Sequence, residues 1–236
     1  MIERQRLRHI LTLGLPIIGG MLSQSLLNLV DAAMVGHLGE KALAGVGIGS
    51  YANFMAIALV MGLGAGVQAQ VARRRGAGRQ DELAAPLNVG MLIALCLALP
   101  LTVFCWLNAQ PIIRLLSGDP EVLGIGTAYF EWRVLAIFAV GLNFSFRGYW
   151  NGNHRSGIYM RTLVIMHLAN VLISYSLIHG LFGLPQMGAP GSGLGTTLAL
   201  YLGSLIYAGQ TWHSARHQGF LTRLPSAIDL RGMLRL

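Results

Sequence analysis

The sequence predicts an all-α integral membrane protein. Of its 236 residues, 54% are hydrophobic and only 11% are charged, whereas about 25% of the residues of a soluble domain are charged. The apolar residues gather into long runs, which are separated by short segments that hold most of the arginines. Because a run of about 20 apolar residues crosses a bilayer as a helix, composition and run length favour one bundle of spanning helices over one or two soluble domains.

Six segments are long and apolar enough to be predicted as spanning helices. Each exceeds the roughly 20 residues that a hydrocarbon core about 30 Å thick requires. The six segments are 10–35, 44–72, 86–107, 123–149, 160–182 and 192–212. The first run continues beyond a signal-peptide core without a clear small-residue cleavage site, which favours an uncleaved first helix. Residues 1–227 are therefore predicted to form one six-helix unit.

The basic residues predict the orientation of this unit. If the N-terminus is cytoplasmic, all Lys and Arg residues except Lys41, Arg114 and Arg133 fall on the cytoplasmic side. Cytoplasmic loops are enriched in Lys and Arg, so both termini are predicted to be cytoplasmic. This distribution accounts for the net charge of +8 without a nucleic-acid partner. The loop RRRGAGRQDE at 73–82 is expected to touch anionic membrane lipid.

Asp31 places a carboxylate inside the otherwise apolar first span. A charge at the bilayer centre costs at least about 2.5 kcal/mol, so intramembrane carboxylates normally face a cavity and carry function. At 100° per residue, Asp31 lies within an arc of about 80° with Gly20, Gln24 and Asn28, which form one polar stripe. Alternatively, hydrogen bonds from Asn28, from Asn170 or from a helix backbone satisfy Asp31, and it only fastens the bundle together.

The fifth and sixth spans supply further polar groups. His167, Asn170 and Ser174 lie within about 60° of one another on a helix that is apolar elsewhere, and Thr196 lies early in the sixth span. Carboxylate, amide and hydroxyl oxygens suit a hard cation, and a single carboxylate can also exchange a proton. We therefore predict a coupling site at Asp31, with Gln24, Asn28 and His167 as possible cavity lining. For His167, a hydrogen-bonded packing role is the alternative.

Pro16 lies in the first span, near its cytoplasmic end. Proline removes a backbone donor and can kink a helix. Two interpretations stay open, an entry-turn proline and a hinge of the kind found in transport helices.

The last nine residues, IDLRGMLRL at 228–236, have the basic-then-apolar character of the segment that opens the first span. They are predicted to begin a connection between two lobes or a seventh span. Because transporters are often built from two related halves with the substrate site between them, the chain is predicted to be the first half of such a protein.

Four segments resemble the multidrug and toxic compound extrusion (MATE) family. Residues 15–47, LPIIGGMLSQSLLNLVDAAMVGHLGEKALAGVG, resemble its opening, with the proline, the Asp and MVGHLG in order. GAGVQAQVARRRGAG resembles the family's second span and loop, LNFSFRGYWNGN its fourth span, and MGAPGSGLGTTLA its sixth. The resemblance covers nearly the whole chain, and its first-span motif is the most specific.

The resemblance implies a proton- or sodium-coupled antiporter that exports organic, often cationic, compounds by alternating access between two six-helix lobes. This chain resembles the N-terminal lobe, which implies a multi-pass protein of the inner (plasma) membrane. A second six-helix lobe is then missing from this chain or supplied by another. The family needs no cofactor beyond the coupling ion, and no metal site is expected apart from a possible sodium at Asp31.

The family's coupling pattern matches this sequence at Asp31, at Asn170 and, in the sixth span, at Thr196. Ser174 stands where the second carboxylate of the pattern would stand. Losing one of two negative charges weakens a sodium site more than a proton site, because a proton needs only one titrating group. Proton coupling at Asp31 is therefore favoured over sodium coupling.

Two alternatives to an antiporter stay open. A lipid-precursor flippase of related architecture would present a cationic central cavity, whereas the arginines here cluster in loops, which counts against it. A truncated, non-transporting membrane scaffold would insert without binding or moving a ligand. No enzyme is expected, because the sequence has no nucleophile paired with a base, no metal-ligand spacing and no phosphate-binding loop.

Overall fold

The computed structural model describes residues 2–222, without the side chains of 2–13, 16, 17 and 21. The predicted start of a connection or seventh span, 228–236, lies outside the described residues. The described part is helical and contains no strand, which confirms the predicted all-α class. Its helices are α1 (Ile2–Gly36), α2 (Glu40–Met61), α3 (Leu63–Gly76), α4 (Ala85–Leu107), α5 (Ala109–Arg114), α6 (Pro120–Val134), α7 (Ile137–Gly152), α8 (Ser156–His179) and α9 (Ala189–Ala215). Single 3₁₀ turns form at Gln80–Glu82, Leu181–Gly183 and Arg216–Gln218.

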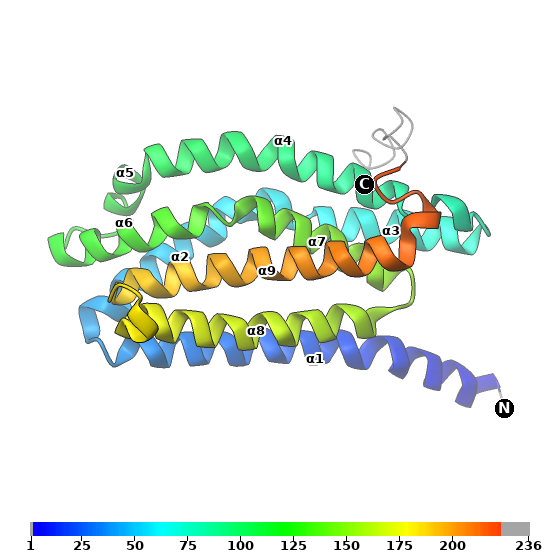
Figure 1. Ribbon diagram of the computed structural model, residues 1–236, viewed down its shortest axis with the longest axis horizontal. Helices are drawn as coiled ribbons and strands as arrows, with labels where there is room; N and C mark the ends of the chain where they lie inside the picture. Colours follow the sequence, from blue (N-terminus) through cyan, green and yellow to red (C-terminus); the bar gives the residue numbers. More distant parts are fainter. Residues whose placement is uncertain (1, 223–236) are drawn as a thin grey trace.

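The long helices lie side by side along one axis, with α4 at one edge of the view and α1 at the other (Figure 1). Within residues 2–222, four helical segments are long and apolar enough to cross a membrane, and a fifth counts if α6 and α7 are taken as one bent span. With 27 residues α9 is long enough, but its polar side chains Ser192, Thr197, Ser204 and Thr211 are buried within the bundle. The predicted number of six spans and the cytoplasmic termini stay predictions.

The predicted fourth span, 123–149, is not one straight helix. It breaks between α6 and α7, which are bent by 49°, although no proline or glycine stands at the break. Carbonyl groups that a helix break frees inside a membrane need other donors, and hydroxyl groups of α4 and α9 provide them. Thr197 donates to Trp132 O at 2.8 Å, Thr102 donates to Val134 O at 3.2 Å, and Tyr201 donates to Leu135 O at 2.8 Å.

Aromatic side chains close the core at one end of the bundle. Trp150, Tyr149 and Phe146 of α7 are fully buried there, and the Phe146 ring stacks on that of Tyr207 of α9 with centroids 5.6 Å apart. At Gly148 of α7 a Cβ would lie 2.3 Å from the carbonyl oxygen of Gly64 of α3. The backbones of α3 and α7 therefore touch, an approach that small residues allow between membrane helices.

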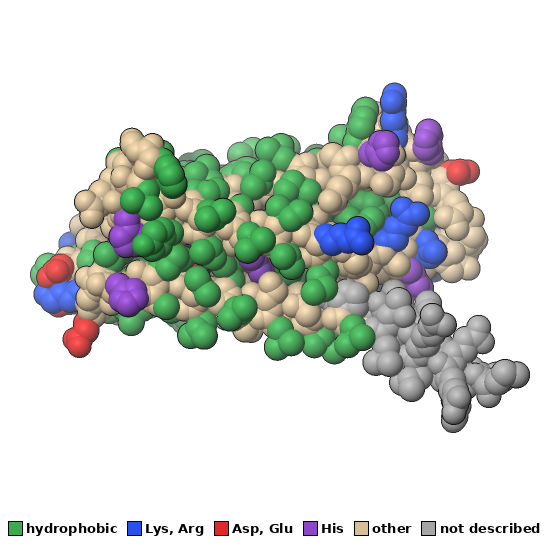
Figure 2. Space-filling model, turned by 60° about the horizontal axis from the view of Figure 1, so that its bottom comes forward, with side chains coloured by type: hydrophobic (Ala, Val, Ile, Leu, Met, Phe, Trp, Pro, Cys, Tyr) green, Lys and Arg blue, Asp and Glu red, His purple; other side chains and the backbone are tan. Residues whose placement is uncertain are grey.

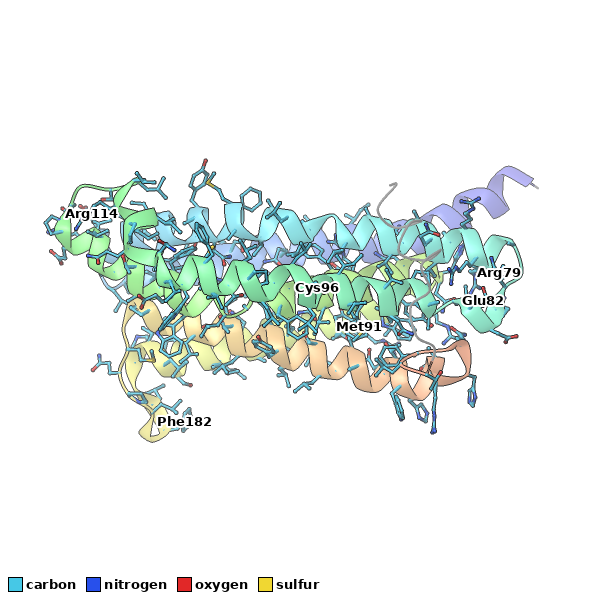
Figure 3. All side chains as sticks on the ribbon, turned by 90° about the horizontal axis from the view of Figure 1, so that it is seen from above. Arg79, Glu82, Met91, Cys96, Arg114 and Phe182 are labelled. Atoms are coloured by element: carbon cyan, nitrogen blue, oxygen red, sulfur yellow. The ribbon has the colours of Figure 1, made fainter. Side chains whose placement is uncertain are left out.

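Charged and apolar side chains occupy different parts of the surface. Hydrophobic side chains cover the body of the bundle, and charged ones gather at its ends (Figure 2). Leu59, Leu172 and Leu205 are each more than two-thirds exposed, as expected of side chains that face lipid. Arg79 and Glu82 lie at the end where α1 begins and α9 ends, whereas Arg114 and Phe182 lie at the opposite end (Figure 3).

Candidate functional site

The site is positioned by the packing of α1 against α8, which lie side by side (Figure 1). Ser23 Oγ of α1 lies 2.7 Å from His167 Nδ1 of α8. Further along both helices, Val35 and Ile178 belong to one buried cluster. Because the two helices rise equally per residue, Asp31, which lies between Ser23 and Val35, is level with Ser174 and Tyr175 of α8, about one turn beyond Asn170.

Asp31 and Asn170 each present an acceptor oxygen that no described residue satisfies. Asp31 is partly buried, and its Oδ1 has no hydrogen-bond donor within the described part of the chain. Asn170 is 1% exposed and donates from Nδ2 to Thr196 Oγ1 of α9 at 2.8 Å. Thr196 in turn donates to Ser192 O at 2.9 Å. The carbonyl oxygen Oδ1 of Asn170 is thereby left buried without a donor among the described groups.

Ser174, the third predicted site residue on α8, faces α9. It is fully buried, and a Cβ on Gly195 would lie 2.3 Å from its Oγ and 2.6 Å from its Cα. Its hydroxyl has Ser192 O as an acceptor at 3.5 Å. The structure thus brings Asn170 together with Thr196, and it packs Ser174 into the contact between α8 and α9.

The three possible cavity-lining residues form one chain of polar contacts. Gln24 Nε2 donates to Asn28 Oδ1 at 3.2 Å, and Gln24 Oε1 lies 3.3 Å from His167 Nε2. Since a carbonyl oxygen only accepts, Nε2 carries a proton, and Nδ1 shares a hydrogen bond with the Ser23 hydroxyl. His167 is buried, whereas Gln24 and Asn28 are exposed.

The helix α1 continues without a break through Pro16, from Ile2 to Gly36. The side chain of Pro16 lies outside the described residues, and the predicted hinge there stays a prediction.

The sequence placed Arg133 only on the outer side of the membrane and did not predict that it is buried. Its Nε and Nη1 atoms are buried without an acceptor in the described part of the chain. The available signal was its position inside the predicted span 123–149, where a charged residue calls for a partner. Among the described side chains, no group of three or more His, Cys, Asp or Glu residues could hold a metal ion.

A family model described as MatE matches residues 16–176 of the chain. The multidrug resistance protein PmpM of Pseudomonas aeruginosa is 31% identical over 210 residues, which cover 88% of this chain and 44% of PmpM. A probable multidrug resistance protein NorM of Bradyrhizobium diazoefficiens is 32% identical over 189 residues, which cover 80% of this chain and 40% of that protein.

Solved structures of MATE proteins also match this chain over about half of their length. Crystal structures of a MATE protein in the straight and bent conformations are both 26% identical to this chain, with TM-scores of 0.81 and 0.80. In each case the match covers 96% of this chain and 50% of the solved chain. The chain thus spans half, or slightly less than half, of the length of these relatives.

Proposed function

Because the chain belongs to the MatE family, whose members are multi-pass membrane transporters and not enzymes, we propose that it forms the N-terminal lobe of an antiporter. This antiporter exports organic, drug-like compounds across the inner (plasma) membrane by alternating access. Its relatives of about twice the length are multidrug resistance proteins by name. The second six-helix lobe is the partner that this proposal requires, supplied in the same chain or by another.

The observation that carries the proposal is the pair of unsatisfied acceptor oxygens, Asp31 Oδ1 and Asn170 Oδ1. A buried acceptor without a donor costs about 1–3 kcal/mol, so the unsatisfied oxygen of Asp31, about one turn from that of Asn170, favours the uptake of a cation or of a proton there. The Asn170 amide cannot turn to donate into the site without losing its bond to Thr196. A proton or cation bound at Asp31 therefore gives its Oδ1 atom the partner that no described residue provides.

Proton coupling is favoured over sodium coupling. A sodium ion prefers several oxygen ligands and is helped by more than one negative charge, and Ser174 supplies no second charge. The hydroxyl of Ser174 is also engaged with α9, whereas one carboxylate is enough to bind a proton. Sodium at Asp31 is the alternative within the same mechanism.

Gln24 and Asn28 offer a surface for the substrate. Both are exposed, and they lie on α1 among large apolar side chains such as Leu22, Leu26 and Leu29, which are more than 60% exposed. Amides that face hydrocarbon are costly, so this part of α1 suits a water-filled cavity covered by the second lobe. Such a cavity combines apolar and hydrogen-bonding groups, as sites for organic ligands do.

The test is an efflux assay with the chain in a transporter that contains both lobes. Proteoliposomes loaded with ethidium are exposed to a pH gradient, or to a sodium gradient at constant pH. Asp31→Asn should abolish pH-driven efflux and leave membrane insertion intact. Asp119→Asn, an exposed substitution of the same chemistry, is the matched control. Normal pH-driven efflux with Asp31→Asn would sink the proposal, and efflux driven by sodium alone would reverse the choice of ion.

A further inference from the structure

A surface groove lies between the beginning of α8 and the end of α9. It encloses about 390 Å³ and lies at the end of the bundle that carries Arg79 (Figures 1 and 3). Its lining residues are Ile158, Arg161, Gly209, Gln210, His213 and Ser214. The proposed coupling site uses none of them.

The polar side chains that line this groove can donate hydrogen bonds to a ligand. Among the side chains that the structure describes, neither Arg161 nor His213 has a hydrogen-bond or ion-pair partner, and no acidic residue lines the groove. Gln210 Oε1 accepts from Thr162 Oγ1 at 3.1 Å, which leaves the Gln210 amide group as a donor. Ser214 adds a hydroxyl. A guanidinium among such donors matches the oxygens of a phosphate group.

The neighbouring side chains place the groove at the level of lipid headgroups. Trp212, adjacent to His213, is 46% exposed, and the Arg216 guanidinium lies 5.0 Å from the centroid of its ring. Exposed Trp and Arg side chains anchor membrane helices at the headgroup region. Under the predicted orientation, this is the cytoplasmic leaflet, where anionic lipids are recognised by basic pockets between helices.

An apolar track leads from the groove towards the middle of the bundle. Ile165 and Leu168 follow Arg161 by four and seven residues, and Leu205 precedes Gly209 by four, so they continue the same helix faces. These three side chains are 46%, 62% and 70% exposed. Donors at headgroup level above an exposed apolar track match both ends of a phospholipid.

We propose that the groove between α8 and α9 is a binding site for an anionic phospholipid of the cytoplasmic leaflet. Arg161 contacts the phosphate, Gln210 and Ser214 donate to its oxygens, and an acyl chain lies along Ile165, Leu168 and Leu205. Lipid binding at this groove does not require transport, so it can be tested separately from the proposed antiport.

Lipid retention by the purified chain tests this proposal. The chain is incubated in detergent with phosphatidylglycerol or phosphatidylcholine, and native mass spectrometry counts the lipids that stay bound. Phosphatidylglycerol should be retained in preference to phosphatidylcholine. Arg161→Ala should weaken this retention about tenfold, because a charged hydrogen bond to phosphate is lost.

A second variant fills the groove without touching its charges. A Cβ at Gly209 would meet no atom within 4 Å, so Gly209→Leu should fold and block the lipid. The matched controls are Gly47→Leu on α2, where a Cβ is equally free of contacts, and Arg114→Ala at the opposite end of the bundle. Both controls should retain phosphatidylglycerol as the unmodified chain does.

Several outcomes would overturn the site. These are equal retention of the two lipids, retention unaffected by both Arg161→Ala and Gly209→Leu, and equal losses in the controls. Inorganic phosphate is added as a competitor in a separate arm. Displacement of the lipid by millimolar phosphate would mean that the groove takes free phosphate, which also overturns the lipid proposal.

Discussion

The amide of Asn170 donates to the hydroxyl of Thr196 over 2.8 Å, and this contact between α8 and α9 fixes which end of the amide faces the site. The Thr196 hydroxyl donates a hydrogen bond to Ser192 O, so the lone pairs of its oxygen are available to accept from Asn170. The carbonyl end of the Asn170 side chain is thereby kept as a buried acceptor. The Thr196 hydroxyl on α9 thus decides that Asn170 on α8 presents an acceptor oxygen, and not a donor, to the site.

This relationship predicts that position 196 acts through the orientation of Asn170. Thr196→Val removes the acceptor of the amide, so the amide can turn and donate into the site. In the two-lobe transporter, pH-driven ethidium efflux should fall markedly with Thr196→Val and persist with Thr196→Ser, which keeps the hydroxyl. Equal efflux by the two variants would show that the hydroxyl does not orient Asn170.

Gly195→Ala is expected to destabilise the bundle. The added Cβ would lie 2.3 Å from Ser174 Oγ and 2.7 Å from the Ser174 backbone nitrogen, and overpacking of this kind typically costs about 1–3 kcal/mol. The melting temperature of the detergent-solubilised chain should fall. Gly209→Ala, which meets nothing within 4 Å, is the control and should melt no earlier than the unmodified chain, because alanine is the better helix former. Similar melting of both variants would contradict the close packing of α8 on α9.

His167 and Ser23 should show a measurable but modest coupling. Their side chains are 2.7 Å apart, and hydrogen bonds between membrane helices contribute about 0.6 kcal/mol on average. A double-mutant cycle with Ser23→Ala and His167→Phe, followed by reversible unfolding in mixed micelles, measures this energy. A coupling energy of zero would mean that the contact does not fasten α1 to α8.

The start of α6 should lose its cap in acid. The backbone N–H groups of Val122 and Glu121 donate to Asp119 Oδ1 at 3.2 and 2.8 Å, and they hold the pKa of Asp119 below its ordinary value of 3.8. Because the folded state favours the charged carboxylate, its stabilisation is complete above 3.8 and is lost as the pH falls through the lowered pKa.

Hydrogen exchange at the two capped amides reports this loss. Exchange at Glu121 and Val122, corrected for its intrinsic pH dependence, should keep its protection above pH 3.8 and lose it as the pH falls further. Asp119→Asn keeps an oxygen acceptor at the cap, so its protection should not change over the same range. Protection of the original chain that is constant with pH would argue against the cap.

The sequence by itself determined the all-α class, the family and the polar stripe that includes Asp31. These depend on local quantities: the length of apolar runs, the angle per residue around a single helix, and a motif read in order. Periodicity states which residues share a face of one helix. It does not state what that face meets, and so the sequence left open whether Asp31 is satisfied.

Only the tertiary structure decided the surroundings of that stripe. It separated exposed Gln24 and Asn28 from partly buried Asp31, fixed the Asn170 amide through Thr196, and placed Ser174 against Gly195. It also broke the span 123–149, where Thr102, Thr197 and Tyr201 supply donors from other helices. The physical reason is the same throughout, since hydrogen bonds and backbone contacts between distant helices depend on packing and not on the periodicity of either helix.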